Sequence, residues 1–191
     1  RQHRSTLRTS VSRKAAHAFA PDKDTADTPV ITTSGATVNG RKRMTYEDFL
    51  TLKERFDEAL IPLEDRCIVL HPKHVTDLLL EDVNLFKSLT DTRNGRPFTF
   101  AGFDCYQFPY MPTYADDSGT LTKVEFGKDD TEQFASVAFC GSEVMRADGE
   151  IYMYSRVDDP EERATIVGFD KRFIALPIRN KGVGAIVSAS V

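Results

Sequence analysis

Hydrophobic residues change their spacing along this chain, and that change restricts the fold more than any other feature. In the first half, apolar side chains recur every three or four residues, which is typical of amphipathic helices. In the second half they form short runs or alternate with polar residues, bounded by Gly, Pro and Asp, which is typical of β-strands. A chain with helices early and strands late is predicted to have an α+β fold.

Two helices are expected in the first sixty or so residues. Residues 4–19 place four apolar side chains four apart, which predicts an amphipathic helix that Pro21 closes. Thr45 with Asp48 three positions later resembles a capping arrangement, because the hydroxyl accepts first-turn amides and the acid favours the positive helix end. A second helix is therefore predicted from Thr45, and Pro62 is expected to end it.

The rest of the chain is expected to be mostly strands. Arg66 to Leu70 is a short apolar run typical of a buried strand, which His71-Pro72 breaks before a further helix carrying Val75, Leu78 and Leu79. Other predicted strands are residues 102–108, 134–140, 150–157, 172–178 and 183–187. Loops or turns are predicted at 91–97, 111–130 and 158–162, and a small helix at 142–146.

Charge is distributed unevenly along the chain. Residues 1–20 contain no acid and carry a charge of +5 from Arg1, Arg4, Arg8, Arg13 and Lys14. Since the whole chain carries −4, the remaining residues carry about −9. An acidic body with a basic end is not typical of a dedicated DNA-binding domain. We expect these five residues either to contact nucleic acid or an acidic neighbouring subunit, or to form a solvated helix face.

Cysteine and histidine give the weak signals for chemistry. Cys67, Cys105 and Cys140 are widely spaced and form no CxxC pair, which argues against a zinc ribbon or a redox dithiol. Together with His71 and His74 they leave open a zinc site or a thiol nucleophile. The thiols lie in apolar strand runs, where cysteine behaves as a small hydrophobic residue. We therefore expect no catalytic residue, no cofactor and no metal site.

Two charged loops have both a plain and a functional interpretation. Asp116-Asp117 with Gly119 is a fragment of a calcium loop, but a polar surface loop is the favoured interpretation. The triplet Arg41-Lys42-Arg43 is favoured as a solvated turn over a contact with an anion or a partner.

Several segments, each ordinary alone, stand in an informative order. A helix ends at an Ile-Pro turn, an Arg-led apolar strand reaches a Pro, a helix containing Leu-Leu follows, and a series of strands closes the chain. These segments are residues 60–72, 77–80, 95–98, 101–106, 134–139, 150–155, 172–178 and 184–187. The succession, from Thr45 to Val187, resembles the major capsid proteins of tailed bacteriophages. Residues 113–130 have no counterpart in that pattern.

The resemblance implies a Hong Kong 97-type capsid fold, which encapsulin compartments share. The N-terminal arm, the extended loop and much of the spine helix of that fold would be missing here. The implied divisions are 1–45 for the end of the spine helix and peripheral-domain strands, 46–149 for the axial domain, 150–178 for returning peripheral strands and 179–191 for a terminal axial strand. Some members crosslink subunits through a Lys–Asn bond, but no such site can be assigned to residues of this chain.

The implied function is structural. Such a protein self-assembles into hexamers and pentamers of an icosahedral shell around a phage genome, with a scaffold protein and packaged DNA as further partners and no membrane. It would be made in the bacterial cytoplasm and reside in the virion. An encapsulin-like shell or a domesticated prophage remnant is the first alternative, and a small cytosolic thiol- or metal-dependent enzyme is the second. No apolar run approaches the roughly 20 residues that span a bilayer.

Overall fold

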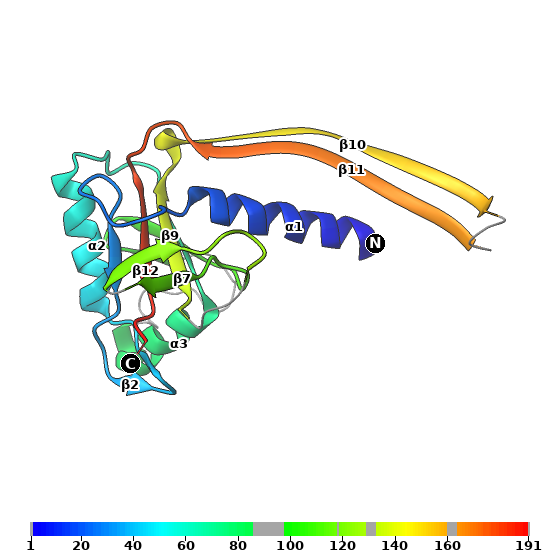
Figure 1. Cartoon of the computed structure of the whole chain (residues 1–191). Coiled ribbons are helices and arrows are strands. Elements are labelled where there is room, and N and C mark those ends of the chain that lie inside the picture. Colours follow the sequence, from blue (N-terminus) through cyan, green and yellow to red (C-terminus); the bar gives the residue numbers. More distant parts are fainter. Residues whose placement is uncertain (1, 86–97, 118, 129–132, 160–163, 191) are drawn as a thin grey trace.

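The computed structural model describes residues 2–85, 98–117, 119–128, 133–159 and 164–190. The helices are α1 (Gln2–Phe19), α2 (Tyr46–Glu58), α3 (Pro72–Glu81) and the short 3-10 helix η1 (Gly141–Glu143). The strands are β1 (Val30–Thr32), β2 (Thr37–Val38), β3 (Arg41–Lys42), β4 (Arg66–Leu70), β5 (Phe98–Phe100), β6 (Phe103–Gln107), β7 (Tyr114–Asp117), β8 (Thr120–Lys123), β9 (Ala135–Cys140), β10 (Val144–Asp159), β11 (Ala164–Pro177) and β12 (Val183–Val187). The predicted α+β class is confirmed (Figure 1).

Six strands form a central sheet in the order β1-β12-β9-β4-β6-β5. β1 is parallel to β12 and β4 is parallel to β6, while the other neighbouring strands are antiparallel. The last strand of the sheet in sequence, β12, thus lies between the first strand and β9. The sheet is therefore held together by contacts between distant parts of the chain.

Helix α2 packs its apolar stripe against one face of this sheet. Its Phe49, Leu52 and Phe56 are completely buried beside Ile68 and Ile186. Burying a side chain of this size contributes about 2 kcal/mol. The close approach requires Gly184 in β12, because a Cβ at that position would lie 2.7 Å from the Phe56 ring.

The opposite face is covered by the end of α1 and by the β7–β8 hairpin. Phe19 packs against Val137 and Phe139 of β9. Tyr114 is completely buried, and its hydroxyl donates a 2.5 Å hydrogen bond to the Pro21 carbonyl. The prediction of an exposed loop over residues 111–130 is therefore wrong for β7 and β8, because burial of the Tyr114 ring anchors this polar stretch to the sheet.

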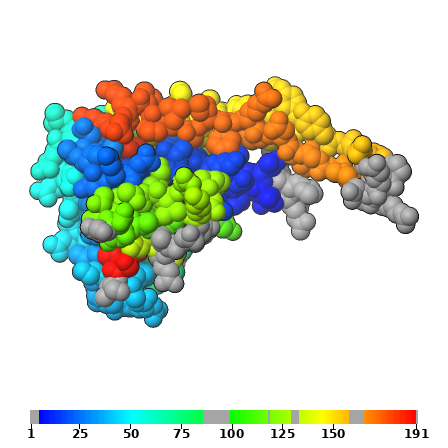
Figure 2. All heavy atoms as spheres, viewed as in Figure 1, coloured from blue at the N-terminus to red at the C-terminus, as the bar shows by residue number. Residues whose placement is uncertain are grey.

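Strands β10 and β11 form a separate two-stranded hairpin that projects from the sheet, with α1 running alongside it (Figure 1). The space-filling view shows the hairpin extending beyond the rest of the molecule (Figure 2). β1 and β12 belong to the six-stranded sheet and not to this hairpin. The division of the chain into peripheral and axial domains stays a prediction.

Local sequence signals explain where the helices begin. Thr45 and Asp48 form the predicted capping box, in which the Thr45 hydroxyl accepts from the Asp48 amide and the Asp48 carboxylate accepts from the Thr45 amide. His71 caps α3 through its ring nitrogen, and Pro72 occupies the first turn, where a missing N–H costs no hydrogen bond.

Two predicted element boundaries are wrong. Helix α2 ends at Glu58, four residues before Pro62, because Leu60 has a positive φ of 54° that reverses the chain. The small helix predicted at 142–146 is instead η1, and Val144 already begins β10. The predicted loop at 91–97 and most of the turn at 158–162 lie outside the described residues.

Candidate interaction surface

One face of the β10–β11 hairpin is on the side of α1, and the other face points away from α1. Residues directly opposite in an antiparallel pair point to the same face. The pairs on the side of α1 are Ile151 with Lys171, Met153 with Phe169 and Ser155 with Val167. The pairs on the other side are Tyr152 with Asp170, Tyr154 with Gly168 and Arg156 with Ile166. Ile151 and Met153 thus share one face of the hairpin, and Tyr152, Tyr154 and Arg156 share the other.

Both faces expose large apolar side chains. Met153 is 65% exposed and Tyr154 is 61% exposed, and these are the values of surface positions. The other exposed apolar residues of the hairpin include Met145, Ile151, Tyr152, Val157, Ile166, Val167 and Ile174. An isolated two-stranded hairpin is marginally stable in water, and an apolar patch of this extent marks an interaction surface. The hairpin therefore lacks, in the isolated chain, the surface that would cover it.

A groove separates α1 from the root of the hairpin. It has a volume of about 580 Å³ and is lined by Ser5, Leu7, Arg8, Val11, Arg146, Ile151 and Lys171. On its hairpin side, Asp148 accepts from Arg146 at 2.9 Å and from Lys171 at 3.2 Å. The groove is thus lined by three aliphatic and three basic side chains, with one serine.

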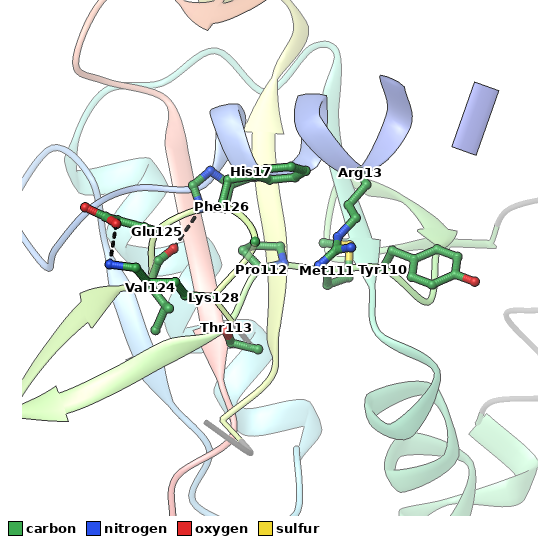
Figure 3. Close-up of a pocket in the computed structure, with 11 residues that line it drawn as sticks. Arg13, His17, Tyr110, Met111, Pro112, Thr113, Val124, Glu125, Phe126 and Lys128 are labelled. Carbon is green, nitrogen blue, oxygen red and sulfur yellow. Dashed lines mark hydrogen bonds and ion pairs between the residues drawn. The ribbon is translucent and has the colours of Figure 1, made fainter. Parts of the chain in front are cut away.

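A second crevice lies where α1 meets the loop after β8 (Figure 3). His17 contacts the Val124 carbonyl at 2.8 Å, and its ring meets the Phe126 ring edge-on with centroids 5.5 Å apart. Burial is the main cause that lowers the pKa of His17 below its usual value. With a volume of about 10 Å³, this crevice has room for about one water molecule and is a packing contact.

Of the five predicted basic residues, the structure describes the side chains of three, and these three do not share one site. Arg8 lines the groove beside the hairpin, whereas Arg13 and Lys14 lie 5.2 and 5.8 Å from the Phe126 ring. Arg1 and the side chain of Arg4 lie outside the described residues. A role of any of them in binding nucleic acid or a subunit stays a prediction.

The residues considered as possible ligands lie in the core or at its edge: Cys67, Cys105, Cys140, His71 and His74. Cys105 and Cys140 are buried and Cys67 is half-buried, and no disulfide joins them. Burial raises the pKa of the Cys67 thiol, and that of Cys105 to about 12, so both are protonated at neutral pH. Within the described part of the chain, no group of three or more His, Cys, Asp or Glu side chains is arranged to hold a metal.

His74 illustrates the structural use of these residues. Its two ring nitrogens lie 2.6 Å from the Ser136 hydroxyl and 2.8 Å from the Ser188 hydroxyl. Burial lowers the pKa of His74 to about 3, so the ring is neutral near pH 7. The contacts tie α3 to β9 and to the residue that follows β12.

The exposed hairpin face is the feature that sequence reasoning missed. Alternation over residues 150–157 predicted a strand, and alternation normally indicates one buried face. A signal was present, since Ile151, Tyr152, Met153 and Tyr154 are all large and apolar in succession. Large apolar residues therefore stand on both faces of this strand, which is typical of a surface that meets another chain.

None of the helices in the described ranges has the length and apolar character needed to cross a membrane.

Comparisons with known proteins identify the fold. No family model and no curated protein matches the chain. Among solved structures, it resembles "Capsid structure of the Cyanophage P-SCSP1u", with 15% identity and a TM-score of 0.59 over 100% of this chain and 64% of that one. It also resembles a structure of Mycobacterium phage Che8, with 11% identity and a TM-score of 0.62 over 95% of this chain and 59% of that one.

A third similar structure is "Asymmetric unit of bacteriophage PhiM1 mature capsid", with 14% identity and a TM-score of 0.57. That match covers 97% of this chain and 61% of the phage chain. The chain therefore spans about three fifths of the length of the structures that it resembles. Taken together with the sheet, α1 and the projecting hairpin, these likenesses show that the chain has the mixed α+β fold of phage capsid structures.

Proposed function

We propose that this chain is the larger part of a tailed-phage major capsid protein, which self-assembles into the icosahedral shell around a phage genome. The observation that carries this proposal is the structural likeness to phage capsids along 95 to 100% of the chain. We assign the fold to the Hong Kong 97 type, with the β10–β11 hairpin and α1 in its peripheral domain and the six-stranded sheet in its axial domain.

The exposed hairpin supports a role in assembly. Its apolar faces are uncovered in the single chain, and a shell subunit covers such faces with neighbouring copies. The subunit is therefore expected to form hexamers and pentamers with itself. A scaffold protein is a further proposed partner, and packaged DNA would be contacted without sequence preference through basic residues such as Arg8. The protein would be made in the bacterial cytoplasm and reside in the virion.

We propose a structural role without catalysis. The thiols of Cys67 and Cys105 are protonated at neutral pH, and His74 is held between two serines deep in the core. The groove beside α1 opens onto the apolar hairpin and is lined mainly by aliphatic and basic residues. These are the properties of side chains that pack or contact a neighbour.

Negative-stain electron microscopy of the protein at its full natural length tests the proposal. It should be expressed both alone and together with the product of the neighbouring upstream gene, in case that product is a scaffold. Uniform closed shells tens of nanometres across are the expected result. Only monomers or small rings under both conditions would contradict the proposal. Shells that hold a cargo enzyme rather than DNA would favour the encapsulin-like alternative.

A further inference from the structure

Strand β10 has one long edge without a hydrogen-bonded neighbour in the described part of the subunit. The β10–β11 ribbon has only two strands, so β11 occupies one edge of β10 and the backbone groups of the other edge point away from the ribbon. Helix α1 packs mainly beside β11 and adds no strand on the free side of β10 (Figure 1). A free strand edge is a template for pairing with another chain.

The usable part of this edge is bounded at both ends. The register of β10 with β11 shifts between Asp148 and Ile151 and again between Arg156 and Asp159, and it is continuous from Ile151 to Arg156. A shift bends the strand locally and interrupts regular pairing. A strand of another chain can therefore pair with a short, regular stretch. We call the free side of residues 150–156 the β10 edge.

The β10 edge lacks the features that protect exposed strand edges. Proteins protect such edges with prolines, with charges or with bulges inside the exposed stretch. Residues 151–155 read Ile-Tyr-Met-Tyr-Ser, without a proline, a glycine or a charge, and all residues from 150 to 156 are exposed. Uncharged segments rich in aromatic and aliphatic residues pair well with their own kind. The composition of the edge therefore favours a second strand as its cover.

The charges at the two ends make the β10 edge complementary to itself. Glu150 and Arg156 are its two charged residues, and each lies three positions from Met153. When two such edges pair antiparallel about Met153, Glu150 of each copy meets Arg156 of the other. A parallel pair in register would place like charges together, which destabilises a sheet. On the face of β11 that points away from α1, Asp170 and Arg172 likewise contribute one charge of each sign.

The charges beyond the β10 edge are compatible with the antiparallel arrangement. Counted outward from Met153, positions 158–159, both Asp, come beside the root of the partner's hairpin around Asp148. This root carries Arg146 and Lys171, which bind the Asp148 carboxylate at 2.9 and 3.2 Å. Two cations against one carboxylate leave the root with a net positive charge. The acids of one copy therefore approach a surface of opposite charge.

We infer that the β10 edges of two copies pair antiparallel across a two-fold axis beside Met153, so that two ribbons form one four-stranded sheet. Tyr152 of each copy then faces Tyr154 of the other, and Glu150 faces Arg156. This inference rests on the proposed shell function, because the partner is a second copy. A two-fold contact uses the same surface on both copies, and icosahedral shells contain two-fold axes. Each charge pair and ring pair therefore occurs twice in the contact.

Disulfide crosslinking in purified shells of the full-length protein tests the pairing at the axis. In Met153→Cys the two introduced thiols face each other across strands about 5 Å apart, a separation that a disulfide spans. In the matched control Ser155→Cys they are about 13 Å apart along the strands, which is too far. After mild oxidation, Met153→Cys should yield at least about tenfold more dimer than the control. The original protein gives the background from Cys67, Cys105 and Cys140.

Charge substitutions test the same pairing without an introduced thiol. The variants are Glu150→Arg, Arg156→Glu and the double variant that combines them, with Glu54→Arg on the exposed side of α2 as the control. The concentration needed for assembly is measured by light scattering. Each single variant brings like charges together at two points and should raise that concentration about tenfold. The double variant should return it to within about threefold of the original, and the control should leave it unchanged.

The outcomes separate this contact from the shell function. Shells of Met153→Cys that yield no more dimer than Ser155→Cys would overturn the pairing, and would be expected if another segment of the full-length protein covered the β10 edge. A double charge variant that assembles no better than either single variant would also overturn it, and decides the case if Met153→Cys forms no shells. If the original protein forms no closed shells, both the function and this contact fail.

Discussion

At the residue scale, His74 couples folding to pH. Its ring is enclosed between the hydroxyls of Ser136 and Ser188, and burial lowers its pKa from an ordinary 6.5 to about 3. The unfolded chain therefore binds a proton between these values that the folded chain does not. Stability is fully present above pH 6.5 and is lost as the pH falls below it.

The expected loss can be measured by urea unfolding between pH 7.5 and 5. For a pKa change from 6.5 to about 3, the free energy of unfolding should fall by about 2 kcal/mol at pH 5 through this residue alone. His74→Gln keeps an amide that can bond to the serines but does not titrate. The difference in free energy of unfolding between the original protein and the His74→Gln variant should shrink as the pH falls. The variant has no histidine at this position, so it does not lose stability through its protonation. Parallel pH profiles would contradict the assignment to His74.

His71 adds to the same trend. Burial lowers its pKa to about 4, and its ring stacks on Phe134 with centroids 4.7 Å apart. His71 is present in both proteins of the comparison above, so their difference reports the titration of His74 together with its electrostatic interaction with His71. Burial also lowers the pKa of His17, so these three histidines contribute to the loss of stability in acid.

At the element scale, the β10–β11 hairpin is separable from the sheet that it leaves. Ala147 and Ile174 are directly opposite one another. Joining them through an Asn-Gly turn therefore shortens the hairpin without changing the register of its root. The core clusters around α2 and β12 lie outside the removed segment. We expect the shortened protein to keep a cooperative unfolding transition of its six-stranded sheet but to form no shells, while α1 loses its cover from β11.

A milder variant provides the control for this deletion. Tyr152→Ser with Tyr154→Ser removes two exposed rings on one face and leaves the strand length unchanged. It should weaken assembly without a change in unfolding temperature, because neither ring is buried in the subunit. A large loss of subunit stability in either variant would show that the hairpin belongs to the folding core.

Elements with local signals could be predicted from sequence, and those held by distant contacts could not. The α2 capping box and the strands β4, β9 and β12 are encoded in consecutive residues, so their patterns identified them. The β7–β8 hairpin was missed because its sequence is polar and its anchor, the Tyr114 hydrogen bond to Pro21, crosses 93 positions. The scattered directions of Arg8, Arg13 and Lys14 likewise depend on where the hairpin and Phe126 lie.

At the scale of the whole molecule, stability is distributed unevenly. The six-stranded sheet has two covered faces, whereas the projecting part of the hairpin has few buried contacts. Segments with few buried contacts open with a low free energy and exchange their amide hydrogens quickly. In the unassembled subunit, we expect amides of residues 151–157 to exchange at least about tenfold faster than those of β9 and β12.

Assembly should slow the amide exchange of the hairpin relative to that of the sheet. Hydrogen-exchange mass spectrometry of purified shells should show strong protection of residues 151–157 and little change in β9, which serves as the internal control. Equal exchange of the hairpin in subunits and shells would mean that it faces solvent in both states, and the assembly surface would then lie elsewhere.

The length of the projecting hairpin converts a small rotation at its base into a large displacement at its far end. Its longer strand, β10, has 16 residues, which corresponds to about 50 Å at 3.3 Å per residue. Both strands leave the sheet where Val144 is opposite Pro177, and a bulge between Asp148 and Ile151 bends the ribbon close to that point. A rotation of about 5° at that point would move the far end by about 4 Å, roughly the width of a strand. Small changes in the bend at the bulge would thus change the angle between neighbouring subunits, and with it the curvature of the shell.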